Sequence, residues 1–325
     1  MKRISIIICC FNSAARLGPT LSAIFAADLR YVLEVVVVDN GSTDQTKSIA
    51  ATAGEFAPVP VVCIEEKRSG LAYARAAGVK ASKGEIISFL DDDNEVTINW
   101  FERVNAGFEG DLGIGAIGGR VLPPNSDTLP KWFDSVAGNF AVGEQAPGSG
   151  YVTTDRMLLW GAGLSVRRSA VGNFYDNPDG ILLIGRRGQD LLAGDDTELC
   201  YWIILSGYEL FYDKEMILRH NLDISRISWR HVLQLNIGFG RARFRLFPYH
   251  VRLKKGRLSR YRFFHSQLIV LLLACADLFL AALRMPFSPS LPKLARVANC
   301  YGYLLENAAH IARPARGFLK SRLGR

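Results

Sequence analysis

Apolar and polar positions form two alternating kinds of segment over the first hundred residues. Short, almost wholly apolar runs with many β-branched residues cover Ser5–Cys9, Glu34–Val38, Val59–Ile64 and Glu85–Leu90. Runs of this length and composition are typical of strands that are buried on both faces. We therefore expect four buried strands in this part of the chain.

Helical patterns separate these strands and predict helices at Leu17–Ala27, Thr43–Ala53, Gly70–Ser82 and Ile98–Phe108. Ser42 is a suitable N-cap for the second of them. Strands that alternate with helices indicate an α/β fold, in which a mostly parallel sheet is covered by helices on both faces. Ligands of such sheets bind beyond the carboxyl ends of the strands.

The following hundred residues have less regular patterns. A Pro-, Gly- and Asn-rich segment at 123–152 reads as a loop, with Trp132, Phe133 and Phe140 as packing anchors. The other elements expected here are a strand at Gly113–Val121, a strand at Trp160–Val166, a helix at Asp195–Leu205, and short strands at Tyr208–Tyr212 and Met216–Arg219.

Composition and charge divide the chain in two. Its 325 residues are 49% hydrophobic, which allows a sizeable core and argues against disorder. The net charge of +8 is uneven, because the first 213 residues carry 18 Lys and Arg against 27 Asp and Glu, whereas the remainder carry 21 against 4. We predict an α/β domain at 1–223 and a basic, partly apolar helical tail at 224–325, whose anionic partner is lipid or nucleic acid.

The apolar part of this tail, Phe263–Leu283, has about the length of a membrane span, but His265, Gln267 and Asp277 interrupt it. We expect a helix or hairpin lying in the membrane interface; a true span and a helix buried against the α/β domain are the alternatives. The flanking basic residues favour anionic headgroups and are Arg252, Lys254, Lys255, Arg257, Arg260 and Arg262.

The expected location is the cytoplasmic face of the plasma membrane, either peripheral or with one inserted helix. The N-terminus is already strand-like and shows no signal peptide pattern. The six cysteines have no metal-ligand spacing and fit a reducing compartment. No nucleic acid partner is expected, because the basic tail leads into an apolar stretch instead of interleaving aromatic residues in a groove.

Three carboxylates, Asp91, Asp92 and Asp93, follow the fourth predicted strand directly. Side chains alternate along a strand, so Asp91 and Asp93 should share one side and Asp92 the other. Two neighbouring carboxylates repel each other unless a cation lies between them, and Mg²⁺ or Mn²⁺ there would also bind phosphate oxygens. The alternative is an acidic turn that caps a helix at Thr97.

Three further segments offer polar groups near strand ends. Asp39 follows the second strand, where it suits a nucleobase or ribose hydroxyl, although a turn around Gly41 explains it equally. Arg75 lies on an Ala-rich helix and is either a cation near phosphate or a solvated side chain. Asp195 and Asp196 open a helix, where acids complement the helix dipole or place a general base in a cleft.

The order of these segments resembles that of family-2 glycosyltransferases, which have the GT-A fold. The match covers residues 4 to about 220, and only Cys9-Cys10 and Asp195 depart from the usual pattern. The segments that carry the resemblance are Cys10-Phe11-Asn12, Val38 to Asp44, Gly70 to Arg75, Phe89 to Asp93, Gly161-Ala162-Gly163 before Arg167-Arg168, and Gly194-Asp195-Asp196.

The resemblance implies inverting transfer of a sugar from a UDP-, GDP- or dTDP-linked donor to a glycan or lipid-linked acceptor, with Mg²⁺ or Mn²⁺ as cofactor. It makes Asp196 the catalytic base. Nucleotide-sugar binding falls to Asp39, Asp44, Arg75, Asp91 and Asp92, and metal binding to Asp93, Asp91 and His220. Acceptor-site candidates are Trp160, Gly161 and Asp195. The segment Gly238–Arg243 is either a mobile loop whose Arg241 and Arg243 close over the diphosphate or a basic patch that faces the membrane.

Other classes of protein fit less well. A sugar nucleotidyltransferase normally carries a Gly-rich phosphate loop after the first strand, and the segment Cys9–Ala15 has no glycine. A dinucleotide oxidoreductase needs G-x-G-x-x-G at the same place. A membrane-associated scaffold that binds nucleotide sugars without catalysis has no need of separate acidic clusters at one sheet edge.

Overall fold

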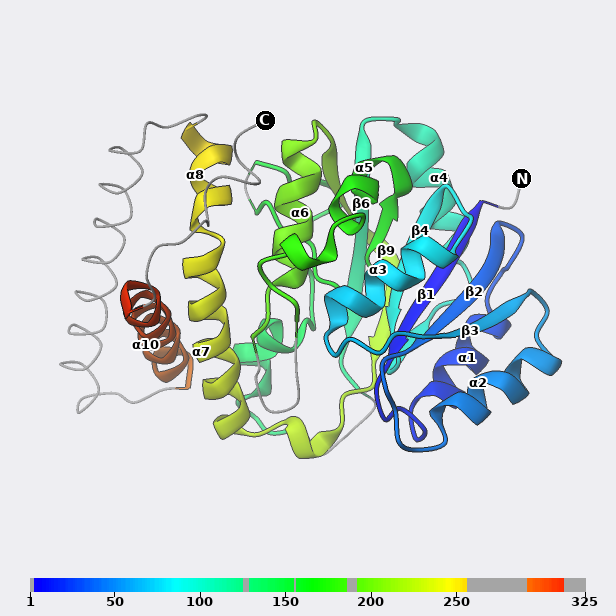
Figure 1. Ribbon diagram of the computed structural model, residues 1–325, viewed down its shortest axis with the longest axis horizontal. Coiled ribbons are helices and arrows are strands. Elements are labelled where there is room, and N and C mark those ends of the chain that lie inside the picture. Colours follow the sequence, from blue (N-terminus) through cyan, green and yellow to red (C-terminus); the bar gives the residue numbers. More distant parts are fainter. Residues whose placement is uncertain (1–2, 125–128, 155, 186–191, 256–290, 313–325) are drawn as a thin grey trace.

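The computed structural model describes residues 3–124, 129–154, 156–185, 192–255 and 291–312. A nine-stranded sheet forms its centre, in the order β3-β2-β1-β4-β8-β6-β9-β5, with β7 paired to β9 (Figure 1). The strands are β1 (Ile4–Cys10), β2 (Val32–Asp39), β3 (Val61–Glu65), β4 (Ile86–Asp91), β5 (Asn94–Val96), β6 (Ile114–Leu122), β7 (Gly150–Tyr151), β8 (Ser165–Arg167) and β9 (Glu209–His220).

The four predicted strands of the N-terminal half are confirmed as one parallel block, β3-β2-β1-β4. Strands β6 and β9 run in the same direction as this block, and β5, β7 and β8 run against it. The sheet of the described residues is therefore α/β and mostly parallel, as expected. Its carboxyl edge collects the ends of β1, β2 and β4.

Helices cover both faces of the sheet. Alternate residues of β1 face opposite cores: Ile4, Ile6 and Ile8 pack with α1 and α4, whereas Ile7 packs with α3, α5 and α6. The helices of this part are α1 (Leu17–Ala26), α2 (Thr46–Glu55), α3 (Leu71–Ala81), α4 (Trp100–Gly110), α5 (Arg168–Tyr175) and α6 (Asp195–Leu205), with 3-10 turns η1 (Phe133–Phe140), η2 (Pro178–Gly180) and η3 (Ile224–Arg226).

Three expected strands differ from those in the structure. The prediction of a strand over Trp160–Val166 begins too early, because Gly163 takes a φ of +71° beneath Trp100 and Leu218, and only Ser165–Arg167 forms a strand. The two short strands after α6 are one strand, β9, whose pairing with β6 shifts between Asp213 and Ile217. That bulge explains the break in the sequence pattern.

The segment expected to be a loop at 123–152 contains η1, and its predicted anchors are confirmed in part. Phe133 and Phe140 are buried and stack on each other with ring centroids 5.5 Å apart, while Trp132 is half-buried against the same core. The predicted cap Ser42 is wrong, because α2 begins at Thr46 and Asp44 accepts the Thr46 N–H.

The described residues of the C-terminal part form the helices α7 (Trp229–Arg245), α8 (Phe247–Lys255) and α10 (Leu291–Ala312). The loop expected at Gly238–Arg243 is wrong, since this segment lies inside α7. Among the described residues, no helix combines the length and the apolarity that crossing a bilayer requires. The apolar stretch Phe263–Leu283 lies outside the described residues.

Helices α7 and α10 lie side by side (Figure 1) and approach closely at two glycines. A Cβ atom on Gly240 would overlap the backbone carbonyl of Asn299, and one on Gly302 would overlap that of Ile237. Arg241 and Arg245 of α7 both pair with Glu306 of α10, at 3.0 and 2.7 Å. The two helices therefore pack as one unit.

Replacing Gly240 with alanine should force α7 and α10 apart, because the added methyl has no space. We expect the free energy of unfolding to fall by about 1–3 kcal/mol, measured by urea denaturation. Gly172→Ala is the matched control: Gly172 is also helical, has no atom within 4 Å of an added Cβ, and should give no loss. Equal stability of the two variants would contradict this packing.

Candidate active site

The ends of three neighbouring strands bring two acidic residues together. In the sheet register, Cys10 at the end of β1 pairs with Asp39 of β2, and Cys9 pairs with Asp91 of β4. Asp39 and Asp91 therefore flank the end of β1. This is the sheet edge at which the sequence pattern places them.

Beside this edge, Asp91, Asp93 and His220 converge, with ligand atoms that all lie within 4.8 Å of one another. Antiparallel pairing of β5 with β9 sets Asn94 opposite His220, which brings the histidine to the turn that follows Asp91. Asn94 stabilises that turn, because its Oδ1 accepts the Asp91 N–H at 3.0 Å. Asp93 and His220 are both buried.

The orientation of His220 is fixed from behind. Its Nδ1 lies 3.0 Å from the carbonyl oxygen of Phe140 and donates to it, since a carbonyl only accepts. Nε2 then faces Oδ1 of Asp93 at 3.2 Å. Burial alone would lower the pKa of His220, but the Asp93 carboxylate raises it overall. Two acceptors that face each other in this way need a proton or a metal cation between them.

The three groups fit a divalent cation. Burial first, and the charge of Asp93 second, raise the pKa of Asp91, and the positive charges of Arg75 and His220 offset this only in part. Two carboxylates and one imidazole suit Mn²⁺, and the carboxylates also suit Mg²⁺. The second-sphere contact from Phe140 to His220 is typical of metal-binding histidines.

Two of the predicted nucleotide-sugar ligands have their carboxylates engaged in holding loops. Asp92 accepts hydrogen bonds from Ser13 and from Arg16, whose Nη2 lies 2.8 Å away. Asp44 accepts the N–H groups of Ala14 and Thr46, each at 3.0 Å. Both residues tie the loop after β1 to its neighbours, so the structure gives them positioning contacts.

Asp39 is fully buried, and its two oxygens differ. Oδ1 accepts the Ser42 N–H at 3.2 Å, across the turn at Gly41, whose φ is +84°. Oδ2 has no hydrogen-bond partner in the described part of the chain, and the Lys47 ammonium lies 3.4 Å from it. A buried carboxylate oxygen with unused capacity is suited to a ligand N–H or hydroxyl.

Arg75 connects the two acidic groups of the site. It is 4% exposed on α3, its Nη1 contacts Oδ2 of Asp195 at 2.6 Å, and its guanidinium lies over the Phe89 ring. Its positive charge lowers the pKa of both Asp91 and Asp196, against the larger effect of burial. The strand-end acids and the start of α6 thus share one electrostatic environment.

Asp196 has the environment of a general base. Its Oδ2 accepts the Gly161 N–H at 3.1 Å and its Oδ1 accepts the Thr197 N–H at 2.7 Å. Burial, with a further contribution from Asp195, raises its pKa to about 6. A Cβ atom on residue 161 would lie 3.0 Å from Nη2 of Arg75, so glycine leaves this guanidinium its space. A carboxylate with this pKa is ionised at neutral pH and accepts protons readily.

Trp160, the expected acceptor-site aromatic, is half-buried next to Gly161. The backbone N–H of Trp160 donates to Oε1 of Gln145 at 2.8 Å, and the Arg156 guanidinium lies 4.9 Å from the centroid of the Trp160 ring. Neither Gln145 nor Arg156 was among the sequence candidates. Nothing in the sequence pattern marks them, because both lie in irregular segments.

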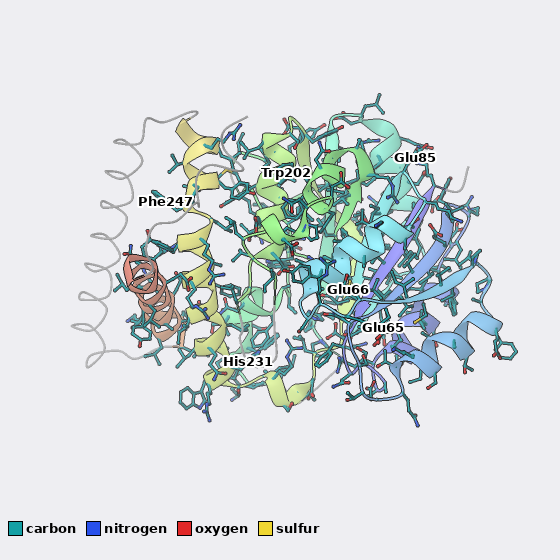
Figure 2. The ribbon with its side chains drawn as sticks, in the orientation of Figure 1. Glu65, Glu66, Glu85, Trp202, His231 and Phe247 are labelled. Carbon is teal, nitrogen blue, oxygen red and sulfur yellow. The ribbon has the colours of Figure 1, made fainter. Side chains whose placement is uncertain are left out.

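Other residues that the sequence did not reveal fix the orientation of the acidic side chains and of His220. Arg16, Asn94 and the Phe140 carbonyl contact Asp92, Asp91 and His220 respectively. Phe140 also stacks on His231, which Figure 2 labels near the first turn of α7. Of these residues, only Asn94 could have been identified from the sequence, because it directly follows the three aspartates.

The diphosphate-loop candidates Arg241 and Arg243 do not lie on a loop beside this site. Arg241 pairs with Glu306 of α10, and the Arg243 guanidinium lies 4.9 Å from the ring centroid of Tyr303 on the same helix. Both arginines lie within helix α7, and the glycines of this segment gave no indication of a helix. We therefore leave both residues out of the proposed donor site.

The family of this chain follows from its similarity to known proteins. The model of the family Glycosyl transferase family 2 matches residues 5–173, which span β1 to α5. The chain belongs to this family. Membership makes it a glycosyltransferase, and the expected identification is confirmed. Asp195, Asp196 and His220 lie beyond the matched residues, so their placement comes from the structure.

Curated relatives are similar over part of their length. The glucosyl-dolichyl phosphate glucuronosyltransferase of Haloferax volcanii is 23% identical over 68% of this chain and 69% of its own. The glycosyltransferase AglE of the same organism is 34% identical over 41% of this chain and 44% of its own. The chain thus spans less than half the length of the second relative.

Solved structures confirm the GT-A-like fold. The mannosyltransferase PcManGT from Pyrobaculum calidifontis, in complex with GDP-Man and Mn²⁺, has a TM-score of 0.57 at 17% identity and covers 94% of this chain and 87% of that chain. S. aureus TarS 1-349 in complex with UDP-GlcNAc has a TM-score of 0.52 at 14% identity, covering 97% and 93%. At these identities the likeness concerns the fold alone.

Proposed function

We propose that this glycosyltransferase moves a sugar from a nucleoside-diphosphate donor to a hydroxyl of a glycan or lipid-linked acceptor, with inversion at the anomeric carbon. The observation that carries the proposal is the convergence of Asp91, Asp93 and His220 within 4.8 Å, in the environment that Arg75 shares with the half-buried Asp196. The site then offers cation ligands and a general base together.

Donor binding is assigned to the end of the parallel block. Asp91, Asp93 and His220 would hold Mg²⁺ or Mn²⁺, which neutralises charge on the departing diphosphate when bound. Asp39 would accept a hydrogen bond from the base or ribose through Oδ2, which has no hydrogen-bond partner in the described part of the chain. PcManGT in complex with GDP-Man and Mn²⁺ supports a nucleotide-sugar donor for this fold.

Proton transfer is assigned to Asp196. With its oxygens held by Gly161 and Thr197, the carboxylate keeps a fixed orientation as the acceptor hydroxyl attacks. Arg75 and Asp195 hold the start of α6 in place through their 2.6 Å contact. One in-line displacement without a covalent intermediate inverts the configuration. Trp160 and Gly161 would form the floor for the acceptor.

The acceptor side of the proposal rests on relatives and on charge. The glucuronosyltransferase of Haloferax volcanii is named for a dolichyl phosphate substrate, and the succinoglycan biosynthesis protein ExoM of Rhizobium meliloti, 23% identical over 67% of each chain, is named for a polysaccharide. The basic excess after residue 213 supports an anionic membrane surface as partner. We place the protein peripherally at the cytoplasmic face of the plasma membrane.

A donor panel tests the function. The purified full chain is incubated with UDP-, GDP- and dTDP-sugars, with Mn²⁺ or with EDTA. Release of nucleoside diphosphate from one donor, dependent on the cation, is the expected result. If pyrophosphate is added, its consumption with formation of a nucleoside triphosphate and a sugar 1-phosphate would instead indicate a nucleotidyltransferase. Tight donor binding without any turnover would indicate a scaffold.

Asp93→Ala should abolish high-affinity Mn²⁺ binding, because it removes one of the three ligands and leaves Asp91 and His220. We expect at least a tenfold rise in the Mn²⁺ dissociation constant by calorimetry, about 1.4 kcal/mol or more. Asp28→Ala, at an acidic residue that pairs with Arg30 on the surface, is the control and should bind as the parent does. Unchanged affinity in Asp93→Ala would contradict the metal assignment.

Asp196→Asn should leave donor binding intact and lower kcat by orders of magnitude, since the amide cannot accept the acceptor proton. Donor affinity is measured by calorimetry and transfer by product formation. Asp195→Asn serves as the neighbouring comparison, with a smaller loss of kcat. Near-normal turnover of Asp196→Asn would show that another group is the base.

The pH dependence follows from the same residue. Because burial raises the pKa of Asp196 to about 6, its basic form is lost as the pH falls through that value. We expect kcat/KM to be level above pH 7 and to fall about tenfold per pH unit well below pH 6. Donor affinity is measured in parallel at saturating Mn²⁺, to separate proton transfer from metal loss. A profile that stays level to pH 5 would rule out this base.

A further inference from the structure

A cavity of about 370 Å³ lies between η1, α7 and α10, apart from the proposed donor site. Its inner wall contains the buried residues Val136, Asn236, Ala295 and Cys300. Pro292 and Arg296 are exposed, so the cavity reaches from the surface into this helical junction. Its volume falls in the range of small-molecule binding sites.

The polar groups around this cavity are cationic or neutral. Two guanidinium groups, from Arg243 and Arg296, line it, and among the described residues no carboxylate does. The neutral polar side chains in the lining are Ser135, Asn139, Asn236 and Asn299. Arginines with amides and a hydroxyl provide several donors for phosphate oxygens and neighbouring hydroxyls.

Arg243 differs from the arginines near it on α7 in its charge interactions. Arg241 and Arg245, two residues away on either side, both pair with Glu306. Arg243 lies over Tyr303 and forms no ion pair with a carboxylate among the described residues. The contact with Tyr303 orients the guanidinium at the cavity while leaving its charge uncompensated.

One element joins this cavity to the metal ligands. Residues Ser135, Val136 and Asn139 of η1 line the cavity, and Phe140, the last residue of η1, holds His220 through its carbonyl. A ligand in the cavity would therefore contact the same short helix that orients His220.

We propose that the cavity between η1, α7 and α10 binds a phosphate-bearing, hydroxylated ligand through Arg243 and Arg296. The cavity is much larger than a lone phosphate needs, which leaves space for the group attached to it. The phosphate could belong to a lipid headgroup or to a soluble sugar phosphate, since both present the same chemistry to the arginines. This proposal does not rest on the proposed transfer reaction.

Calorimetric titration of the full chain tests the site. The probes are inorganic phosphate, glucose 1-phosphate and farnesyl phosphate, with glucose and farnesol as uncharged controls. Arg243→Gln and Arg296→Gln should each raise the dissociation constant of the tightest phosphate probe about tenfold or more, as loss of a charge-assisted hydrogen bond predicts. Arg241→Gln is the matched control and should bind as the parent does. Circular dichroism checks that each variant is folded.

Asp93→Ala separates this cavity from the donor site and should leave probe binding unchanged. A preference for farnesyl phosphate would assign the ligand to a lipid headgroup, and a preference for glucose 1-phosphate to a soluble sugar phosphate; either supports the proposal. Three results would overturn it: no binding, equal binding by the Arg243→Gln and Arg296→Gln variants and the parent, or loss of binding in Asp93→Ala. Farnesol bound as tightly as farnesyl phosphate would also overturn it.

Discussion

The repulsion between two neighbouring acids at one sheet edge, the half-buried Asp91 and the buried Asp93, is the constraint on which the rest of this structure depends. Asp91, Asp93 and His220 are packed so that their ligand atoms lie within 4.8 Å, and burial makes uncompensated charge costly there. The chain commits much of its local structure to holding them: Asn94 fixes the turn after β4, and the Phe140 carbonyl fixes the imidazole. A site held this firmly in an unfavourable arrangement is suited to a cation.

Arg75 extends that arrangement toward the chemistry. Its guanidinium is buried between Asp195 and the Phe89 ring, and its charge acts on Asp91 and on Asp196. The raised pKa of Asp196 results from burial that Arg75 only partly offsets. Cation site and base are thus tuned by one side chain, which lies on α3, the helix that precedes β4. Through Arg75, the carboxylate at the cation site and the carboxylate of the proposed base affect each other's surroundings within one α/β fold.

The sequence was sufficient for the parallel half of the fold, because strands buried on both faces leave an unmistakable apolar pattern. It also placed Asp39 and Asp91 at one edge, since parallel strands end together. It failed where long-range contacts decide the conformation. The Gly-rich segment ending at Arg243 is helical because Gly240 and Gly302 let α7 and α10 approach, and that partner is sixty residues away. Gln145 and Arg156 carry no local signal, and Asp92 is held by Arg16, which no spacing rule predicts.

The central claim is that His220 and the strand-end aspartates bind a divalent cation that also contacts a diphosphate. Pulsed electron paramagnetic resonance of the Mn²⁺-loaded protein tests it directly. We expect a nitrogen coupling from the imidazole, absent in His220→Gln, and a phosphorus coupling that appears on adding UDP or GDP. Bound Mn²⁺ with no nitrogen coupling in the parent, or with none from phosphorus at saturating nucleotide, would contradict it.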